Sequence, residues 1–196
     1  MHAPVVDHSP AVSLLALARP SCHRCGGLGV LENRGTGRAC ACVARRVFAE
    51  CLASYRHCHQ TMTASGNVQY ERIGHAQGRC AIVASFKRAE YAADFVMAAA
   101  RALADRAIEH AVFRAFHLRG LEWSDAVAVV NRELRMIAHP LNKGSFFNSV
   151  YRAEEVIGRA ILVMEPYSLY PARDYFAGTV LPAIAHANRF RCDPAR

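Results

Sequence analysis

Apolar residues recur at steps of three and four along most of the second half of the chain, which is the period of an amphipathic helix. The stretch that begins near Glu90 carries this pattern as far as Phe116, either as one long helix or as two abutting helices. We expect Gly120 to end it, because glycine adopts the left-handed conformation of a helix C-cap without strain. This half of the chain is therefore predicted to be helical.

Two further helices are predicted beyond Gly120. Ser124 is a candidate N-cap for the first helix and Asn142 for the second, and Pro140 breaks the chain between them. The second helix is expected to run to about Met164. An apolar stripe along it is predicted to face the core, and it comprises Phe146, Val150, Ala153, Ile157, Ala160 and Met164.

The composition is that of a folded protein with a basic surface. Of the 196 residues, 53% are hydrophobic and 20% are charged, which is enough apolar material for a core and argues against disorder throughout. The formal net charge is +8. Such a surplus favours a polyanionic partner, because cations that meet phosphates release counterions. A basic protein without such a partner is the simpler alternative.

No segment contains the roughly 20 consecutive apolar residues that span a bilayer, so no membrane association is expected. The apolar residues 11–18 follow Asp7 without a basic region before them, which makes them a poor secretory signal. We therefore expect a cytoplasmic protein. In that reducing compartment the eight cysteines are expected to bind metal or to remain thiols rather than to form disulfides.

Four of the cysteines have the spacing of a metal site. Cys22 and Cys25 form a CxxC pair, and Cys40 and Cys42 form a CxC pair after 14 intervening residues. Two close pairs of thiolates supply the four ligands that zinc prefers in a tetrahedron. Because four thiolates leave no open position for water, the predicted cofactor is a structural Zn2+ and not a catalytic one.

The remaining cysteines show no convincing ligand pattern. Cys51, Cys58 and Cys80 are expected to be buried thiols, and the role of Cys192 is left open. His57 and His59, which flank Cys58, are alternative metal ligands.

The residues between the two cysteine pairs predict a small hairpin. Glycines follow the CxxC pair directly and let the backbone turn so that amide groups point at the thiolate sulfurs. Residues 28–38 are predicted to form a β-hairpin with Gly35 and Gly37 at its tip. A helix is predicted over residues 43–58.

The Cys-x-x-Cys-Gly-Gly-x-Gly run resembles half of a DnaJ-type cysteine-rich zinc module. The CxC pair before a basic helix resembles the zinc knuckles of some helicase-loader proteins. The DnaJ-type repeat occurs once here instead of four times, and the chain lacks a GxxxxGK[ST] phosphate loop. The resemblance therefore implies a zinc knuckle without chaperone activity or nucleotide binding.

The predicted fold class is mainly α, with a small zinc knuckle (a β-hairpin plus a helix) followed by a helical domain. We expect a flexible arm at residues 1–20, the knuckle and its basic helix at 21–59, and a linker at 60–89. The helical domain is placed at residues 90–165. A C-terminal extension at residues 166–196 is expected to wrap back on the helices.

Arginines surround the predicted knuckle, and the guanidinium fork suits phosphate oxygens. An equally simple reading is a solvated basic face. The candidate phosphate contacts are Arg24, Arg34, Arg38, Arg45 and Arg46.

The last long helix also carries a second stripe, which is polar and partly basic. A recognition helix needs this division, because one side must pack on a scaffold while the other reads base edges in the major groove. The candidate DNA-binding residues are Lys143, Ser145, Asn148, Ser149, Arg152 and Arg159.

About 55 residues of this region resemble region 4 of bacterial sigma factors and other sigma-like helix-turn-helix domains. On the supporting helix and the helix after it, the resemblance is carried by Val112, Phe113 and Phe116 and by Trp123 and residues 126–130. On the last helix it is carried by Phe147, Val150, Tyr151, Arg152, Ala153, Glu154, Gly158 and Arg159. It implies binding to double-stranded DNA, with RNA polymerase as a further partner. Residues 135–141 make the junction before the last helix longer than in sigma-like domains, which puts its docking angle in question.

The whole arrangement also resembles a group of prophage-type proteins and, by its parts, late antitermination proteins of phages. Trp123 is expected to lie in the core of the helical half. No GxSxG, HExxH or phosphate-loop motif is present, and the single CxxC lacks the companion residues of a zinc deaminase, so an enzyme is not expected.

The preferred hypothesis is a sequence-specific DNA-binding transcription regulator of phage or prophage type that acts with RNA polymerase. The alternative is a zinc-stabilised protein-interaction adaptor without DNA binding. A third reading is an RNA-binding factor, since zinc knuckles also hold single strands. The sequence leaves the oligomeric state open.

Overall fold

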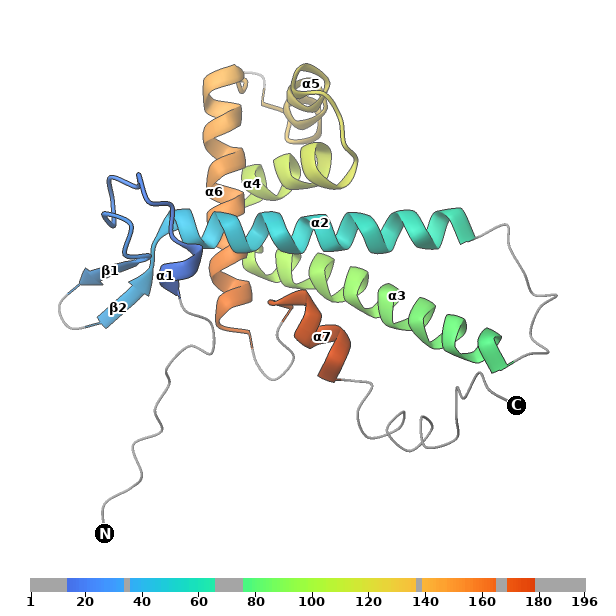
Figure 1. Ribbon diagram of the computed structural model, residues 1–196. Helices are drawn as coiled ribbons and strands as arrows, with labels where there is room; N and C mark the ends of the chain where they lie inside the picture. Colours follow the sequence, from blue (N-terminus) through green and yellow to red (C-terminus); the bar gives the residue numbers. More distant parts are fainter. Residues whose placement is uncertain (1–13, 34–35, 66–75, 137–138, 165–168, 179–196) are drawn as a thin grey trace, which may run out of the picture.

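The computed structural model describes residues 14–33, 36–65, 76–136, 139–164 and 169–178. Helices dominate these ranges, and a small antiparallel hairpin precedes the long helices (Figure 1). The predicted fold class, mainly α with a small knuckle followed by helices, is confirmed. Within the described ranges, no helix combines the length and apolar character needed to cross a membrane.

The described chain opens with a short helix and the hairpin. Helix α1 spans Leu14–Leu17, and strand β1 (Val30–Asn33) pairs with β2 (Thr36–Ala39). Gly37 lies opposite Glu32 inside the ladder, so it is a strand residue and not part of the predicted tip. Residues 34 and 35, and with them Arg34, lie outside the described residues.

Two long helices then run side by side in opposite directions (Figure 1). Helix α2 spans Ala41–Ser65 and α3 spans Ala76–Ala102. Residues 60–65 and 76–89 therefore belong to helices, which corrects the predicted linker at 60–89. Both segments are helical although they contain polar residues and a glycine, which on local grounds favour a break in a helix.

The predicted arm and extension also contribute to the core. Leu17 and Ala18 are buried, so this part of the expected flexible arm at 1–20 belongs to the core, and residues 1–13 lie outside the described residues. Leu169 is fully buried, and Tyr175 on α7 (Ala172–Gly178) packs on Tyr91. The described part of the extension therefore wraps back on the helices, as expected.

The remaining helices form the region that was expected to resemble a helix-turn-helix domain. They are α4 (Ala107–Val112), the π-helix η1 (Phe113–Leu118), α5 (Trp123–Glu133) and α6 (Lys143–Leu162). Gly120 has a φ of +65° and follows η1, so it ends that helix as predicted. Asn142 caps α6 as predicted, whereas α5 begins at Trp123 with Glu122 as its N-cap. Ser124 is therefore not the cap.

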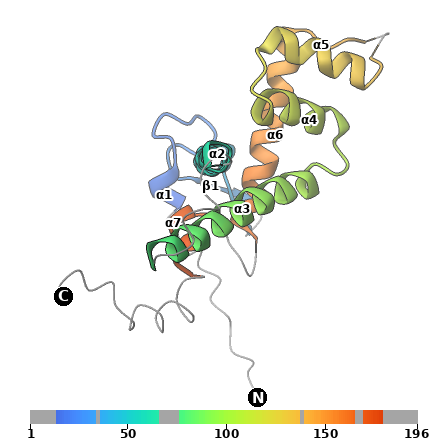
Figure 2. The same cartoon turned by 90° about the vertical axis from the view of Figure 1, so that its right-hand side faces the viewer.

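Helix α6 joins two hydrophobic clusters. Its second half contributes Ala153, Ile157 and Ile161 to a cluster shared with α2, α3 and α7. Its first half contributes Phe146 and Val150 to a cluster shared with α4, η1 and α5. In Figures 1 and 2, α6 crosses α2 and continues beyond it toward α5. The knuckle helix α2 and the region of α4, η1 and α5 are thus held together by packing on α6.

Candidate metal centre and nucleic-acid interface

The four predicted metal ligands lie together. Cys22 and Cys25 stand in the turns after α1, Cys40 directly follows β2, and Cys42 lies in the first turn of α2. Their sulfur atoms all lie within 4.8 Å of one another. The Cys22 and Cys40 sulfurs are 3.8 Å apart, and those of Cys25 and Cys42 are 3.7 Å apart. The predicted grouping of these cysteines is confirmed, and it forms a site suited to a metal ion.

Backbone hydrogen bonds hold the two cysteine pairs against each other. The amide of Gly26 donates to the Cys22 carbonyl at 2.8 Å, and the amide of Cys40 donates to the Gly29 carbonyl at 2.8 Å. Gly27 has a φ of +84°, and a Cβ atom there would lie 3.2 Å from the carbonyl oxygen of Pro20. Glycine is required at this position, because it allows both the turn and the close approach.

The thiols of Cys22, Cys40 and Cys42 differ in pKa because their surroundings differ. Amide hydrogen bonds from Cys25 and Arg24 lower the pKa of Cys22 to about 6. Burial raises the pKa of Cys40 to about 12 and also raises the pKa of Cys42. Cys22 is therefore the thiolate at neutral pH, and metal binding must displace protons from Cys40 and Cys42.

Other cysteines and histidines do not join the cluster. Cys51 and Cys58 are buried, and the Cys51 thiol donates to the Leu169 carbonyl oxygen at 3.6 Å. Among the described residues, the four-cysteine group is the one set of three or more ligand types close enough for a metal. His57 and His59 are exposed on α2 and are not part of it. The side chain of Cys80 and the whole of Cys192 lie outside the described residues.

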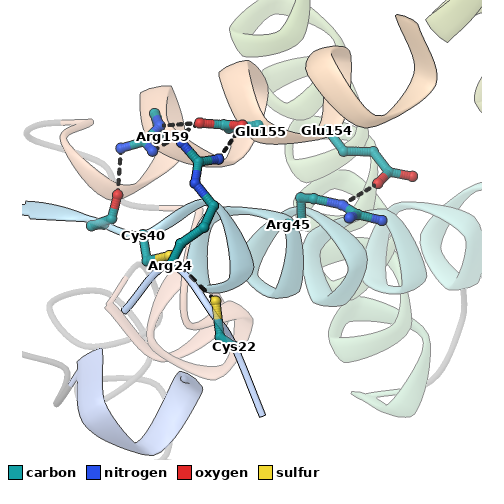
Figure 3. A network of polar contacts seen from close by, with 8 residues as sticks. Cys22, Arg24, Cys40, Arg45, Glu154, Glu155 and Arg159 are labelled. Atoms are coloured by element: carbon teal, nitrogen blue, oxygen red, sulfur yellow. Dashed lines mark hydrogen bonds and ion pairs between the residues drawn. The ribbon is translucent and has the colours of Figure 1, made fainter. Parts of the chain in front are cut away.

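Several arginines predicted to contact phosphate instead form ion pairs within the chain (Figure 3). Arg45 donates to Glu154 at 2.9 Å, and Arg24 lies 4.0 Å from Glu155. Arg46 pairs with Glu50 on the same helix at 3.1 Å. These three guanidinium groups are therefore already paired with carboxylates of the same chain.

Arg159 connects α6 to the hairpin. Its guanidinium donates to Glu155 at 2.8 Å and to the carbonyl oxygen of Ala39, the residue before Cys40 (Figure 3). The side chain is half-buried. Its prediction as a DNA-binding residue is therefore corrected: Arg159 positions the knuckle against α6.

The Glu154 carboxylate contacts an arginine and lies close to a buried histidine. Nε2 of His117 lies 3.5 Å from Glu154, and the imidazole packs against the Phe48 ring. Burial raises the pKa of Glu154, but the neighbouring His117 and the hydrogen bond and charge of Arg45 outweigh it, so the net pKa is lowered. Sequence reasoning missed Glu154, Glu155 and His117, although two adjacent acids in a basic region were a usable signal.

The predicted DNA-binding stripe on α6 divides into three parts. Lys143, Asn148 and Arg152 are exposed on the first half of the helix. The Ser145 hydroxyl is used in the capping box with Asn142. Ser149 is buried, because its side chain points into the packed side of α6. The prediction that it contacts DNA is therefore wrong. The open part of the stripe is therefore Lys143, Asn148 and Arg152.

Of the predicted phosphate contacts near the knuckle, Arg38 is exposed on β2.

The start of α6 is fixed by contacts from the preceding turn. The side-chain amide of Asn131 donates to the Leu141 carbonyl at 3.2 Å, and its oxygen accepts from the Leu141 amide at 2.8 Å. Lys143 lies 5.0 Å above the Trp123 ring. Trp123 is 36% exposed, so its predicted place in the core is wrong. Its ring supports the ammonium group at the surface.

No family model, curated protein or solved structure matches this chain. The chemistry of the site therefore has to be inferred from its geometry. That geometry offers a four-thiolate metal centre and, on the first half of α6, an open polar stripe.

Proposed function

We propose that this chain is a DNA-binding transcription regulator in which the first half of α6 enters the major groove. One observation carries the proposal: Asn148 and Arg152 are exposed on the side of α6 opposite its packed side, and Lys143 is exposed at the start of the helix. Asparagine pairs with adenine and arginine with guanine through bidentate hydrogen bonds in the major groove. Lysine near the helix start suits a phosphate.

The packing of α6 supports this role. Phe146 and Val150 anchor its first half in the cluster built with α4, η1 and α5. The capping box and the Asn131 hydrogen bonds fix where α6 begins. A helix that reads bases must be held rigidly by its scaffold, and these contacts provide such a support.

We further propose that the metal is Zn2+ in a structural role. A Zn–S bond of about 2.3 Å gives tetrahedron edges of about 3.8 Å, which matches the 3.8 Å and 3.7 Å sulfur separations. Four thiolates saturate the ion and leave no position for substrate or water. Cys22, Cys25, Cys40 and Cys42 would hold it, and the ion would fix the hairpin to the start of α2.

A second candidate function is a zinc-stabilised adaptor, and the ion pairs favour it. Arg24, Arg45 and Arg159 are paired with glutamates, which leaves the knuckle fewer free cations for phosphate. Leu28 beside the metal centre is 66% exposed, and an exposed leucine suits a protein partner. In the DNA-binding proposal, this knuckle surface is where RNA polymerase would be contacted.

The deciding experiment is selection of bound sequences from a random duplex pool by the zinc-loaded full chain. DNA binding through α6 predicts enrichment of a short motif. It also predicts that the logarithm of the binding constant falls linearly with the logarithm of the salt concentration, with a slope of about −0.9 for each phosphate contacted. An adaptor predicts no enriched motif and no such dependence.

A further inference from the structure

Helix α3 carries an apolar stripe on the side away from its core contacts. The stripe residues recur at alternating steps of four and three, which is the spacing of a coiled-coil seam. Phe86 is 67% exposed and Met97 is 47% exposed. Tyr91, Phe95 and Ala99 of the same helix are buried, and α2 lies along α3 in Figure 1. On α3 the stripe comprises Phe86, Glu90, Ala93, Met97 and Ala100, and Ala104 continues it in the turn that follows the helix.

We propose that this stripe binds a second copy of this chain, with the two α3 helices antiparallel. Pairing centred at the level of residue 95 sets Met97 against Ala93 of the second copy. The same register sets Phe86 against Ala104, so that each large side chain meets a small one. Two-fold symmetry repeats every contact, and small residues allow the close approach that interlocking side chains need.

Charge complementarity selects the second copy and the antiparallel direction. Glu90 is exposed near one end of the stripe, where one oxygen accepts from Lys87 at 2.9 Å. Arg101 is exposed near the other end, and no ion pair involves it within the described part of the chain. In the antiparallel register, Arg101 of one copy lies beside Glu90 of the other, twice. A parallel pair would instead oppose Glu90 to Glu90.

The exposed apolar side chains also explain why a partner is needed. Phe86 and Met97 are exposed large hydrophobic residues in one line with the exposed Ala93 and the half-buried Ala100, with Glu90 as the one charged member. Exposed apolar side chains gathered on one face mark an interaction site. The inference does not depend on DNA binding, because α3 is separate from the open residues of α6.

Sedimentation equilibrium of the full chain, from micromolar to millimolar concentration, tests the proposal. The expected result is a monomer–dimer equilibrium. Met97→Glu should weaken dimerisation about tenfold or more, because it places a charge in the seam. Val163→Glu is the matched control, since Val163 is 80% exposed at the end of α6 and outside the seam. Circular dichroism should show unchanged helicity in both variants.

Charge reversal tests the register. Glu90→Arg and Arg101→Glu should each weaken the dimer several-fold, and the two changes combined should restore it. A monomer throughout the concentration series would overturn the proposal, as would a dimer that Met97→Glu leaves intact. A double charge reversal that fails to restore dimerisation would overturn the antiparallel pairing.

Discussion

Gly158 of α6 lies directly against the backbone of Ala44 in α2. A Cβ atom on Gly158 would sit 1.9 Å from the Ala44 carbonyl oxygen. Ala44 follows the metal-site residue Cys42 by two positions, and Gly158 precedes Arg159, which donates to the Ala39 carbonyl. The metal knuckle and the long helix α6 therefore meet at one close backbone crossing.

Gly158→Ala should destabilise the protein by about 2 kcal/mol or more. The new methyl group would force α2 and α6 apart, and this overpacking outweighs the gain of about 1 kcal/mol in helix propensity. Gly144→Ala on the same helix is the control, because its Cβ would meet only the Asn142 side-chain oxygen at 3.4 Å. Urea unfolding measures both changes. Equal stability of Gly158→Ala and the wild type would contradict the crossing.

Cys22→Ser combined with Cys25→Ser should abolish metal binding at the four-cysteine cluster, whose sulfur atoms lie within 4.8 Å of one another. Two ligands are removed, so the hairpin and the start of α2 lose their attachment and unfold more easily. Elemental analysis of the purified chain gives the metal content. Cys51→Ser should retain the ion, because Cys51 is buried away from the cluster. Full metal content in the double variant would refute the site.

Glu154→Gln should lower stability at neutral pH by about 1–2 kcal/mol, because it removes the charged acceptor of the Arg45 hydrogen bond and the negative charge beside His117. The pKa of Glu154 is lowered from its ordinary 4.5 in the folded protein. Its contribution is therefore complete above pH of about 4.5 and is lost as the pH falls through the folded pKa.

Thermal unfolding across the acid range measures this difference between Glu154→Gln and the wild type. The two should converge at low pH. Glu122→Gln serves as a control, because Glu122 is exposed and no ion pair involves it within the described ranges. A difference that stays constant from neutral to acid pH would show that the Glu154 charge is not responsible.

Trp123→Ala should cost only about 1 kcal/mol, because the ring is at the surface beneath Lys143. Phe146→Ala should cost about 3–5 kcal/mol, because Phe146 is fully buried in the cluster that supports α6. Denaturant titration of the two variants compares them directly. A larger loss for the tryptophan variant would place the support of α6 elsewhere.

Local rules were sufficient where a feature depends on neighbouring residues. The spacing of Cys22, Cys25, Cys40 and Cys42 was enough to group them, because short loops bring close pairs together. The side chain of Asn142 bonds an amide three residues away, so its capping role was visible in the sequence. The end of η1 at Gly120 followed from the conformational freedom of glycine.

Features that depend on packing between distant parts of the chain could not be predicted from the sequence. Arg45 and Glu154 are 109 positions apart, so nothing local indicated that the arginine is paired. Ser149 is expected in the polar stripe, yet it lies three residues after Phe146 and four before Ala153, so it shares their buried face of the helix. The polar residues 60–65 stay helical within the long helix that packs on α3.

The most direct measurement is the affinity of the Arg152→Ala variant for a duplex that carries the selected motif, determined by fluorescence anisotropy. Arg152 is exposed on the open part of α6, and loss of a base contact should weaken binding by about 1–3 kcal/mol and relax preference at one base pair. Arg173→Ala, at an exposed position on α7, should bind like the wild type. Wild-type affinity in Arg152→Ala, or an equal loss in Arg173→Ala, would contradict recognition through α6.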